Sequence, residues 1–536
     1  MRRSLLTMLI TACLPILLFA QEQLENAQEM GLDEKINEAF TPISNAFQSV
    51  ILFRVFDIPF VVILLVGGAT FFTLYFGFVN IRRFPMAINV VRGKYDDLDG
   101  HGSGNPQAAV DGDIPDTIRD ESKEGEVTHF QALATAVSGT VGLGNIAGVA
   151  LAIALGGPGA TFWMIVCGLL GMSTKFVECT LGVKYRDVGE DGTIYGGPMY
   201  YMTKGLKEVG AGGVGKVLSV IFAILCIGAS FGGGNAAQSN QAASQLAELM
   251  GMESGASGTL IGVGLAVLVG FVIIGGIKRI ASVTEKIVPF MAVIYVSACL
   301  FIILSNISLI DDAFGLIFSQ AFTPEAGLGG LFGVLIVGFQ RAAFSNEAGA
   351  GSASIAHSAV KTKYPASEGL VALLEPFIDT VVICTMTALV IIFYNESGGV
   401  FDYGGDGNGS VVINGETVEG AVLTSMAFES VIPWFPYILT LAIVLFAIST
   451  MISWSYYGSQ AWMYLFGRSK TSDLVYKFIF CLFIVVGAGA SMDAVWGFSD
   501  AMILGLVFPN MIGLFFLFPK VKEEVARYVG AIKEMK

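Results

Sequence analysis

The sequence has little charge and few of the residue types that build catalytic or metal centres. Charged side chains make up 14% of the 536 residues, whereas 54% are hydrophobic, and the mean hydropathy is +0.70. The three histidines lie near predicted loops, which argues against a histidine-based catalytic or metal site. The seven cysteines fall inside hydrophobic stretches, without the spacing of a metal site or a disulfide framework.

Two functional classes are excluded by further absences. There is no basic face for nucleic acid. The formal charge is -14, but the acidic residues crowd into a few loops such as Asp96–Glu126, so the total says little about partners. The hydrophobic stretches contain no nucleophile-base pair and no metal-ligand cluster, so we do not expect an enzyme. What is present is a composition typical of a protein whose solvent is mostly lipid.

The N-terminus has the order of a secretory signal peptide. Arg2 and Arg3 precede an apolar run from Leu5 to Ala20, and the polar Gln21 follows. We expect cleavage near Ala20. The alternative is an uncleaved first span, but roughly sixteen apolar residues are short for crossing a bilayer.

Hydrophobic stretches long enough to cross about 30 Å of hydrocarbon recur along the chain. Because they are long and continuous, they favour helices over a barrel. We therefore predict an all-α polytopic membrane protein with about eleven transmembrane helices. The stretches are 56–80, 130–155, 160–183, 216–248, 258–277, 285–305, 331–356, 368–394, 434–464, 472–491 and 497–518.

Lysine and arginine occur in alternate loops of this arrangement. One set of loops contains pairs such as Lys278 and Arg279, whereas the loops between them, including 306–328 and 396–432, contain neither residue type. Short loops rich in lysine and arginine stay in the cytoplasm. We therefore expect a multi-pass protein of the inner membrane, with a periplasmic N-terminus after cleavage and a cytoplasmic C-terminus.

Glycine interrupts two of the predicted helices. Three glycines lie within Ser138–Asn145, and a second glycine-rich interruption is Phe344–Ser352. Glycine costs roughly 1 kcal/mol relative to alanine inside a helix, so each cluster favours an unwound segment. Close helix packing through small residues is the alternative. Two broken helices in corresponding positions are typical of an inverted-repeat transporter.

This pattern predicts the organisation of the whole chain. Each repeat would contain five helices, and one extra helix would precede them. The glycine-rich external stretch Asn395–Val418 is compatible with a small hairpin over the entrance. The predicted segments are a signal peptide (1–20), a periplasmic segment (21–55), the extra helix (56–80), an acidic cytoplasmic loop (81–129), the first repeat (130–305), an external loop (306–330), the second repeat (331–518) and a cytoplasmic tail (519–536).

Three blocks of the sequence resemble the alanine or glycine:cation symporter family, also called the sodium:alanine symporters. The blocks are Gln131–Val149, Phe344–Ala353 and Ser449–Gly458. The run Val141–Asn145 also resembles the first broken helix of sodium-dependent leucine transporters, which implies a LeuT-like fold of five plus five helices.

The resemblance implies sodium-coupled symport of a small neutral amino acid, alanine or glycine, by alternating access. Sodium would be the co-transported ion, and membrane lipid and the amino acid would be the partners of a monomer. Proton-coupled symport of the same substrates and an ion channel remain as alternatives.

The expected substrate site lies at the first break. Backbone N–H groups of Leu143 and Gly144 are suited to a carboxylate, although these residues could instead serve packing. Gln238 and Asn240 could orient the ligand or join neighbouring helices. Thr450 and Trp454 lie one turn apart on one helix face, where a bulky indole would limit side-chain volume. The predicted substrate-binding residues are Thr140, Leu143, Gly144, Gln238, Asn240, Thr450 and Trp454.

The resemblance also implies a sodium site made of oxygens. Carbonyls of Ser138 and Val141 would combine with oxygens of Ala447 and Thr450. Related chains have hydroxyls at two successive positions, but here Met451 follows Thr450, so Ser449 is the substitute. Hydroxyls that bond back to their own helix are the alternative. The predicted sodium ligands are Ser138, Val141, Ala447, Ser449 and Thr450, with Asn145 for a first site if one exists.

Ionisable residues inside the predicted spans are candidates for structural or gating roles, because each is costly in lipid unless paired or hydrated. Glu178 and Glu347 could accept hydrogen bonds from unwound backbone, or take part in gating or proton coupling. The predicted structural or gating residues are Glu178, Arg341, Asn346 and Glu347, and the other ionisable residues in the spans are Lys175, Glu375 and Asp379.

Overall fold

The computed structural model describes residues 31–99, 125–189, 192–252, 255–322, 331–404 and 409–535. The predicted signal peptide lies outside these residues, as does most of the acidic loop. The described part is mainly helical, and its strands form three two-stranded sheets. The predicted fold class, an all-α polytopic membrane protein, is confirmed.

The first half of the chain contains the helices that position the first break. Thr128 caps α6, because its hydroxyl accepts the N–H of Gln131 while the Gln131 side chain accepts the N–H of Thr128. The elements are α2 (Leu32–Ile51), β1 (Arg54–Val55), β2 (Ile58–Pro59), α3 (Phe60–Tyr75), α4 (Val79–Arg82), α5 (Phe84–Val91), η1 (Asp96–Asp99), α6 (His129–Thr140), η2 (Leu143–Asn145), α7 (Ala147–Gly156), α8 (Gly159–Lys184), β3 (Asp187–Val188), β4 (Ile194–Tyr195), α9 (Pro198–Glu208), α10 (Gly212–Phe231), η3 (Gly232–Ala236), α11 (Ala237–Met250), α12 (Ser257–Ile273) and α13 (Gly276–Ser305).

The second half repeats the pattern of a broken helix followed by long spans. Ser469 and Ser491 cap α22 and α23 by accepting backbone N–H groups three residues later. The elements are η4 (Ile307–Leu309), α14 (Ile310–Gln320), α15 (Leu331–Asn346), α16 (Ala353–His357), α17 (Pro365–Ala372), α18 (Leu374–Pro376), η5 (Phe377–Cys384), α19 (Thr385–Glu396), β5 (Ser410–Ile413), β6 (Glu416–Glu419), α20 (Gly420–Glu429), α21 (Phe435–Phe466), α22 (Lys470–Gly489) and α23 (Met492–Glu534).

The helix lengths support a protein that crosses the membrane many times. Among the described residues, seven helices are long and apolar enough to span a membrane, and the bent pair formed by His129–Thr140 and Leu143–Gly156 makes an eighth. Two shorter apolar helices are Phe60–Tyr75 and Ser257–Ile273. Each predicted stretch contains a described helix. The number of eleven spans stays a prediction.

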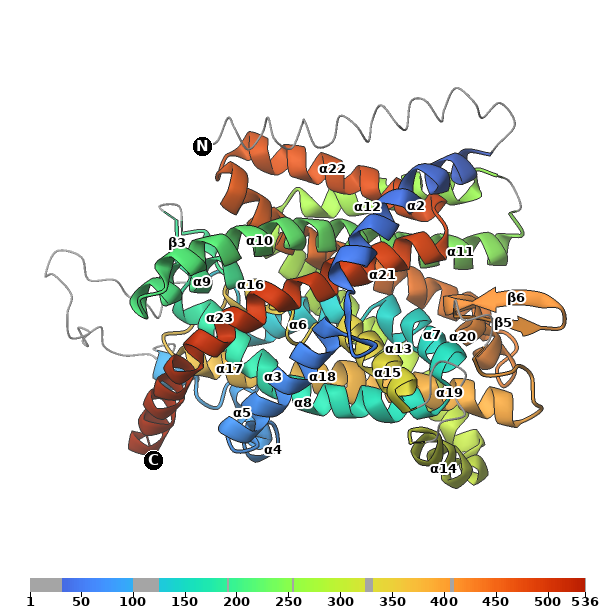
Figure 1. The fold of residues 1–536 in the computed structure, drawn as a ribbon, viewed down its shortest axis with the longest axis horizontal. Helices are drawn as coiled ribbons and strands as arrows, with labels where there is room; N and C mark the ends of the chain where they lie inside the picture. The colour runs from blue at the N-terminus through green and yellow to red at the C-terminus, as the bar shows by residue number, and fades with distance from the viewer. Residues whose placement is uncertain are drawn as a thin grey trace, which may run out of the picture.

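The two halves interlock through their broken helices. The first break, η2, contacts α15, η5, α11 and α21, which come from both halves. Helices α12 and α22 pack together along one edge of the molecule, and α8 and α19 lie along the opposite edge (Figure 1). The broken helices therefore lie between these edges.

Peripheral elements surround this core. The amphipathic helix α2 packs along α23, where Phe40 and Phe47 contact the ring of Phe498 edge-on. The extra helix α3 packs on α8 and α23. The expected hairpin exists as β5 and β6, paired from Ser410 opposite Glu419 to Ile413 opposite Glu416.

Helix α23 differs from the expected span of 497–518 by continuing to Glu534. The continuation includes most of the predicted cytoplasmic tail. Val521, Tyr528 and Ile532 are buried at helical spacing along it. These apolar contacts keep the segment helical beyond Pro519, since an amphipathic stripe stabilises a helix by packing.

Candidate functional site

The first break has the unwound geometry that its glycines predict. The axes of α6 and of the η2–α7 segment differ by 55°. The free N–H of Gly142 donates to Asn145 Oδ1 at 2.8 Å, and that of Leu143 donates to Gln238 Oε1 at 3.1 Å. A Cβ added at Gly142 would lie 2.4 Å from Thr450 Oγ1. The break therefore needs glycine there, and it directs backbone donors toward side-chain oxygens.

The second break interrupts the chain between α15 and α16. Glu347, Gly349 and Gly351 all have positive φ angles, of 55°, 94° and 83°. Because a non-glycine residue at positive φ is uncommon, Glu347 is a strained position fixed by its surroundings. The Asn346 side chain stabilises the turn, since its Oδ1 accepts the N–H of Ala348 at 2.9 Å.

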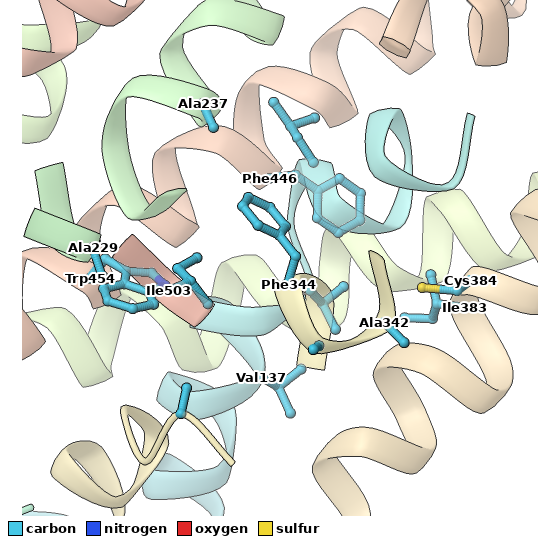
Figure 2. Close-up of a cluster of buried hydrophobic side chains, with 14 of the residues drawn as sticks. Val137, Ala229, Ala237, Ala342, Phe344, Ile383, Cys384, Phe446, Trp454 and Ile503 are labelled. Carbon is cyan, nitrogen blue, oxygen red and sulfur yellow. The ribbon is translucent and has the colours of Figure 1, made fainter. Parts of the chain in front are cut away.

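The two breaks lie against each other, as the inverted-repeat hypothesis requires. A Cβ added at Gly144 would lie 3.4 Å from the Ser345 Cα atom and 3.5 Å from the Phe344 ring. Figure 2 shows Phe344, Trp454 and Ile503 in the buried region beside these segments. Segments about two hundred residues apart in the chain thus meet in the interior.

Gln238 lies at the first break, whereas Asn240 does not. The π-helical segment η3 precedes Gln238, whose Nε2 donates to the Gly233 carbonyl at 2.8 Å while its Oε1 accepts from Leu143. Asn240 instead donates to the carbonyls of Gly487 at 3.2 Å and Ala490 at 2.7 Å. Asn240 therefore joins α11 to the end of α22, which is the second of its two predicted alternatives.

Trp454 lies in a tightly packed wall near the second break. A Cβ added at Gly234 would lie 2.2 Å from the indole, so η3 and Trp454 are in close contact. The indole N–H donates to Glu347 Oε1 at 2.9 Å, and the Ser352 hydroxyl donates to Glu347 Oε2. Glu347 is thus held by side chains rather than by unwound backbone N–H groups, which were the first of its two alternatives.

Several of the predicted sodium ligands meet where α6 crosses α21. Ser138 Oγ donates to the Ser449 carbonyl at 2.8 Å, and Thr450 Oγ1 donates to the Ser138 carbonyl at 2.9 Å. The Ser449 hydroxyl bonds back to the Phe446 carbonyl at 2.9 Å, which is the back-bonded alternative. The Thr140 hydroxyl likewise bonds back to the Ala136 carbonyl at 3.2 Å. Val141 and Ala447 are buried, and no side-chain contact decides their role.

Asp379 is a buried carboxylate that the sequence analysis did not place in the site. It lies on the π-helical segment η5, and it accepts hydrogen bonds from Asn145 Nδ2 at 2.7 Å and Ser345 Oγ at 2.9 Å. Asp379 therefore contacts both breaks. Its position in an apolar span was the only available signal, because the partners come from distant segments.

The chemistry around the breaks suits a hard monovalent cation. Within the described ranges, no group of three or more histidine, cysteine, aspartate or glutamate side chains could hold a metal ion. Carbonyls, hydroxyls and the carboxylates of Asp379 and Glu347 are present instead, and oxygen ligands are those that hard cations prefer. The residues that could hold such a cation are Ser138, Ser449 and Thr450 at one place, and Asn145, Ser345 and Asp379 at another.

Two cavities approach the breaks from opposite ends of the molecule. One of about 200 Å³ lies at the expected external end, and the ion pair between Arg341 and Asp500 lines it together with Trp496. Trp496 stacks on Phe344 with ring centroids 4.8 Å apart. The other cavity, of about 360 Å³, lies at the expected cytoplasmic end and includes Gln460 in its lining.

Glu178 is connected to the second break through a residue that the sequence analysis missed. Asn510 of α23 donates to Glu178 Oε1 at 2.7 Å and to the Gly349 carbonyl at 2.8 Å. The amide therefore bridges α8 to the unwound segment. Glu178 thus contacts the unwound segment through the Asn510 amide, and its role as a clamp or in gating stays a prediction.

Comparison with known proteins agrees with this geometry. The family model described as "Sodium:alanine symporter family" matches residues 41–536. A protein of Methanococcus maripaludis named "Sodium/alanine symporter AgcS" is 40% identical over 473 residues, which cover 88% of this chain and 94% of that protein. The Bacillus subtilis protein named "Amino-acid carrier protein AlsT" is 34% identical, with 84% of this chain and 85% of that protein covered.

A solved structure supports the fold independently. The crystal structure of MhsT in complex with L-phenylalanine matches with a TM-score of 0.50 at 15% identity, covering 74% of this chain and 100% of that chain. This likeness concerns the fold alone. The chain therefore belongs to the sodium:alanine symporter family, and it is a multi-pass, cation-coupled amino acid symporter with a LeuT-like fold.

Proposed function

We propose that this protein carries alanine or glycine into the cell together with sodium by alternating access. The observation that carries the proposal is the contact between the two breaks. Beside it, Gln238 is the partner of the Leu143 N–H among the described residues, and a substrate can replace this side chain. Sequence identity to a protein named as a sodium/alanine symporter supports the choice of substrate and ion.

The substrate carboxylate is proposed to bind the N–H groups of Leu143 and Gly144. Gln238 Oε1 already accepts the Leu143 N–H at 3.1 Å, so an amide oxygen occupies the position proposed for a carboxylate oxygen. Substrate binding would displace this contact and leave Gln238 to orient the ligand. The helix end adds a favourable interaction with negative charge.

The size of the substrate is proposed to be limited by Trp454. Its indole packs on Gly234 and is fixed by Glu347, so the wall cannot move without breaking a buried hydrogen bond. A rigid wall excludes side chains larger than a methyl group at little cost to alanine. A Bacillus subtilis relative, 32% identical, is named "Probable sodium/glutamine symporter GlnT". In this chain we propose that the Trp454 wall is what favours alanine or glycine over larger substrates.

Sodium is proposed to bind where α6 crosses α21. The Ser138 carbonyl and the Thr450 hydroxyl converge at 2.9 Å, and the proposed ligands Val141 and Ala447 are buried on the same two segments. A second position is proposed beside Asp379, with Asn145 as a further ligand. A cation at either place would draw α6 and its partner helix together, which couples ion binding to the shape of the break.

Alternating access is proposed to open one cavity at a time. At the external end, the Arg341–Asp500 ion pair and the Phe344–Trp496 stack separate the cavity from the breaks. Opening this end would separate α15 from the start of α23.

The segments 130–305 and 331–518 are proposed as the two inverted repeats of a monomer in the inner membrane. The orientation and the cleaved signal peptide are those predicted from the sequence.

Transport in proteoliposomes tests the proposal. Purified protein should accumulate labelled alanine transiently above equilibrium when sodium is supplied outside, and it should exchange labelled for unlabelled alanine. A panel of labelled amino acids under imposed sodium or proton gradients separates the two coupling ions. Alanine flux that follows only a proton gradient would exclude sodium coupling, and flux without counterflow would indicate a channel.

A further inference from the structure

Five ionisable side chains form a continuous chain at the expected cytoplasmic end of the broken helices. They come from five different elements: His129 is the first residue of α6, Lys175 lies on α8, His357 is the last residue of α16, Glu368 lies on α17 and Glu375 on α18. This cluster of five side chains therefore connects the inner ends of both broken helices.

The side chains are in direct contact with one another. Lys175 Nζ lies 3.0 Å from Glu375 Oε1, and His357 Nδ1 lies 2.5 Å from Glu368 Oε1. The other oxygen of Glu368 contacts His129 Nδ1. Of these five side chains only that of His129 is accessible, with 11% exposed.

Two atoms in the middle of the chain lack hydrogen-bond partners among the described residues. His357 Nε2 and Glu375 Oε2 are both buried and make no hydrogen bond, and they face each other at 3.6 Å. A shift of about 0.5 Å would bring them to hydrogen-bond distance. An unpaired buried nitrogen opposite an unpaired carboxylate oxygen is a place where a proton is stabilised as an N–H donor.

The charges of the five-residue cluster sum to zero only when one of its two histidines is protonated. Lys175 neutralises Glu375, which leaves the Glu368 carboxylate between His129 and His357. With both imidazoles neutral, Glu368 would be an uncompensated charge away from water, which is costly. With one imidazole protonated, the group is neutral.

Other ionisable groups surround the cluster, on the elements that pack against it. The carboxylates are Glu126 before α6, Glu178 of α8, Glu285 of α13, Glu347 of the second break and Glu524 of α23. The remaining groups are Cys179 of α8, Arg186 after α8, Tyr457 of α21 and Arg527 of α23.

Two of these neighbouring carboxylates, when ionised, favour binding of the proton. Glu178 and Glu347 accept from the neutral donors Asn510 and Trp454, so their ionisation would add negative charge. Glu524 is paired with Lys184 at 2.5 Å. Arg186 donates to the carbonyls that follow α16.

We propose that this cluster is a proton-binding site, in which His129 and His357 share one proton opposite Glu368 and thereby hold the inner end of α6 closed. The inference goes beyond sodium coupling, and it rests on the proposed function only in that α6 moves during transport. The proton enters from water onto the imidazole of His129, and leaves to water when His129 separates from Glu368. Loss of the proton at alkaline pH leaves Glu368 uncompensated and destabilises the closed inner end.

Two variants remove the need for the proton in opposite ways. Glu368→Gln removes the negative charge, and His129→Lys supplies a permanent positive charge opposite it. Wild-type sodium-driven alanine uptake should fall on the alkaline side by about tenfold per pH unit, the slope of a single proton. Both variants should flatten this alkaline limb, whatever their absolute rates.

The measurement is initial uptake in proteoliposomes from pH 6 to pH 9.5 at fixed, saturating sodium. Lys520→Gln, which breaks an exposed ion pair with Glu523 on α23, is the control and should keep the wild-type profile. The proposal would be overturned if uptake by both Glu368→Gln and His129→Lys fell at alkaline pH with the wild-type slope and midpoint. It would also be overturned if wild-type uptake did not fall at alkaline pH. If a variant fails to fold, the other carries the test.

Failure of the proposed function would look different. A protein that is not a sodium-coupled carrier shows no sodium-driven alanine uptake at any pH. In that case the proton site is tested by the pH dependence of the protein's thermal unfolding in detergent, compared between wild type and Glu368→Gln. The wild type should lose stability at alkaline pH relative to the variant, and equal profiles would overturn the proton site.

Discussion

Replacing Trp454 tests the wall that we propose to restrict the substrate. The indole is 1% exposed, packs on Gly234 and donates to Glu347. Trp454→Ala removes the wall and leaves a space for a larger side chain. Leucine has three more side-chain carbons than alanine, and burying each is worth about 0.8 kcal/mol, or about 2.4 kcal/mol in total. Leucine should therefore gain up to about fiftyfold in affinity relative to alanine.

The assay is competition of unlabelled leucine against labelled alanine at a fixed sodium gradient. Trp454→Phe is the matched control, because it keeps most of the wall and removes only the bond to Glu347. The phenylalanine variant should still reject leucine, although losing a donor to a buried carboxylate should cost about 1.5–3 kcal/mol of stability. The alanine variant should unfold at lower temperature, since large-to-small changes cost about 3–5 kcal/mol.

One result would refute the reasoning. If Trp454→Ala folds, transports alanine and still rejects leucine, the indole does not form the wall of the substrate site. A leucine gain in both variants would instead place the selectivity in the hydrogen bond to Glu347.

The remaining predictions concern the ion, the ligand and the first break. Thr450→Ala and Asn145→Ala should each raise the sodium concentration for half-maximal uptake by about tenfold, since each removes an oxygen ligand worth on the order of 1.4 kcal/mol; unchanged sodium dependence in both would remove the coupling assignment. Gln238→Ala should weaken alanine binding with little change in sodium dependence, measured by alanine titration at saturating sodium. Asn240→Ala should leave alanine affinity unchanged but lower the unfolding temperature, because two hydrogen bonds of about 1 kcal/mol each join its helix to α22. Gly142→Ala should abolish uptake while the protein still inserts into the membrane, since its Cβ would lie 2.4 Å from Thr450 Oγ1; normal uptake would show that α6 and α21 need not approach so closely.

Much of the architecture could be predicted from the sequence because it depends on local properties. The length of an apolar stretch decides whether a helix can cross lipid, and clustered glycines weaken a helix wherever they occur. The breaks at Gly142 and Gly349 followed from these rules. The hairpin of β5 and β6 lies in a glycine-rich stretch that was compatible with it. The resemblance further identified Gln238 and Thr450, which the structure places at the first break.

Roles that depend on the partner of a polar group could not be predicted. Asn240 and Gln238 are the same kind of side chain two residues apart, and only the packing of α22 decides that Asn240 joins helices. Asp379 meets Asn145 across 234 positions of the chain. No local pattern encodes such contacts.

Local sequence properties predicted which stretches form helices apolar enough to cross a membrane and where two of those helices are broken, because hydrophobicity and helix propensity act over a few turns. The tertiary structure alone decided which buried charges meet. His357 follows a predicted span and was expected near a loop, yet it is fully buried between Glu368 and Glu375. A buried charge is stable only with its partner in place, and that partner comes from whichever helix the fold brings alongside.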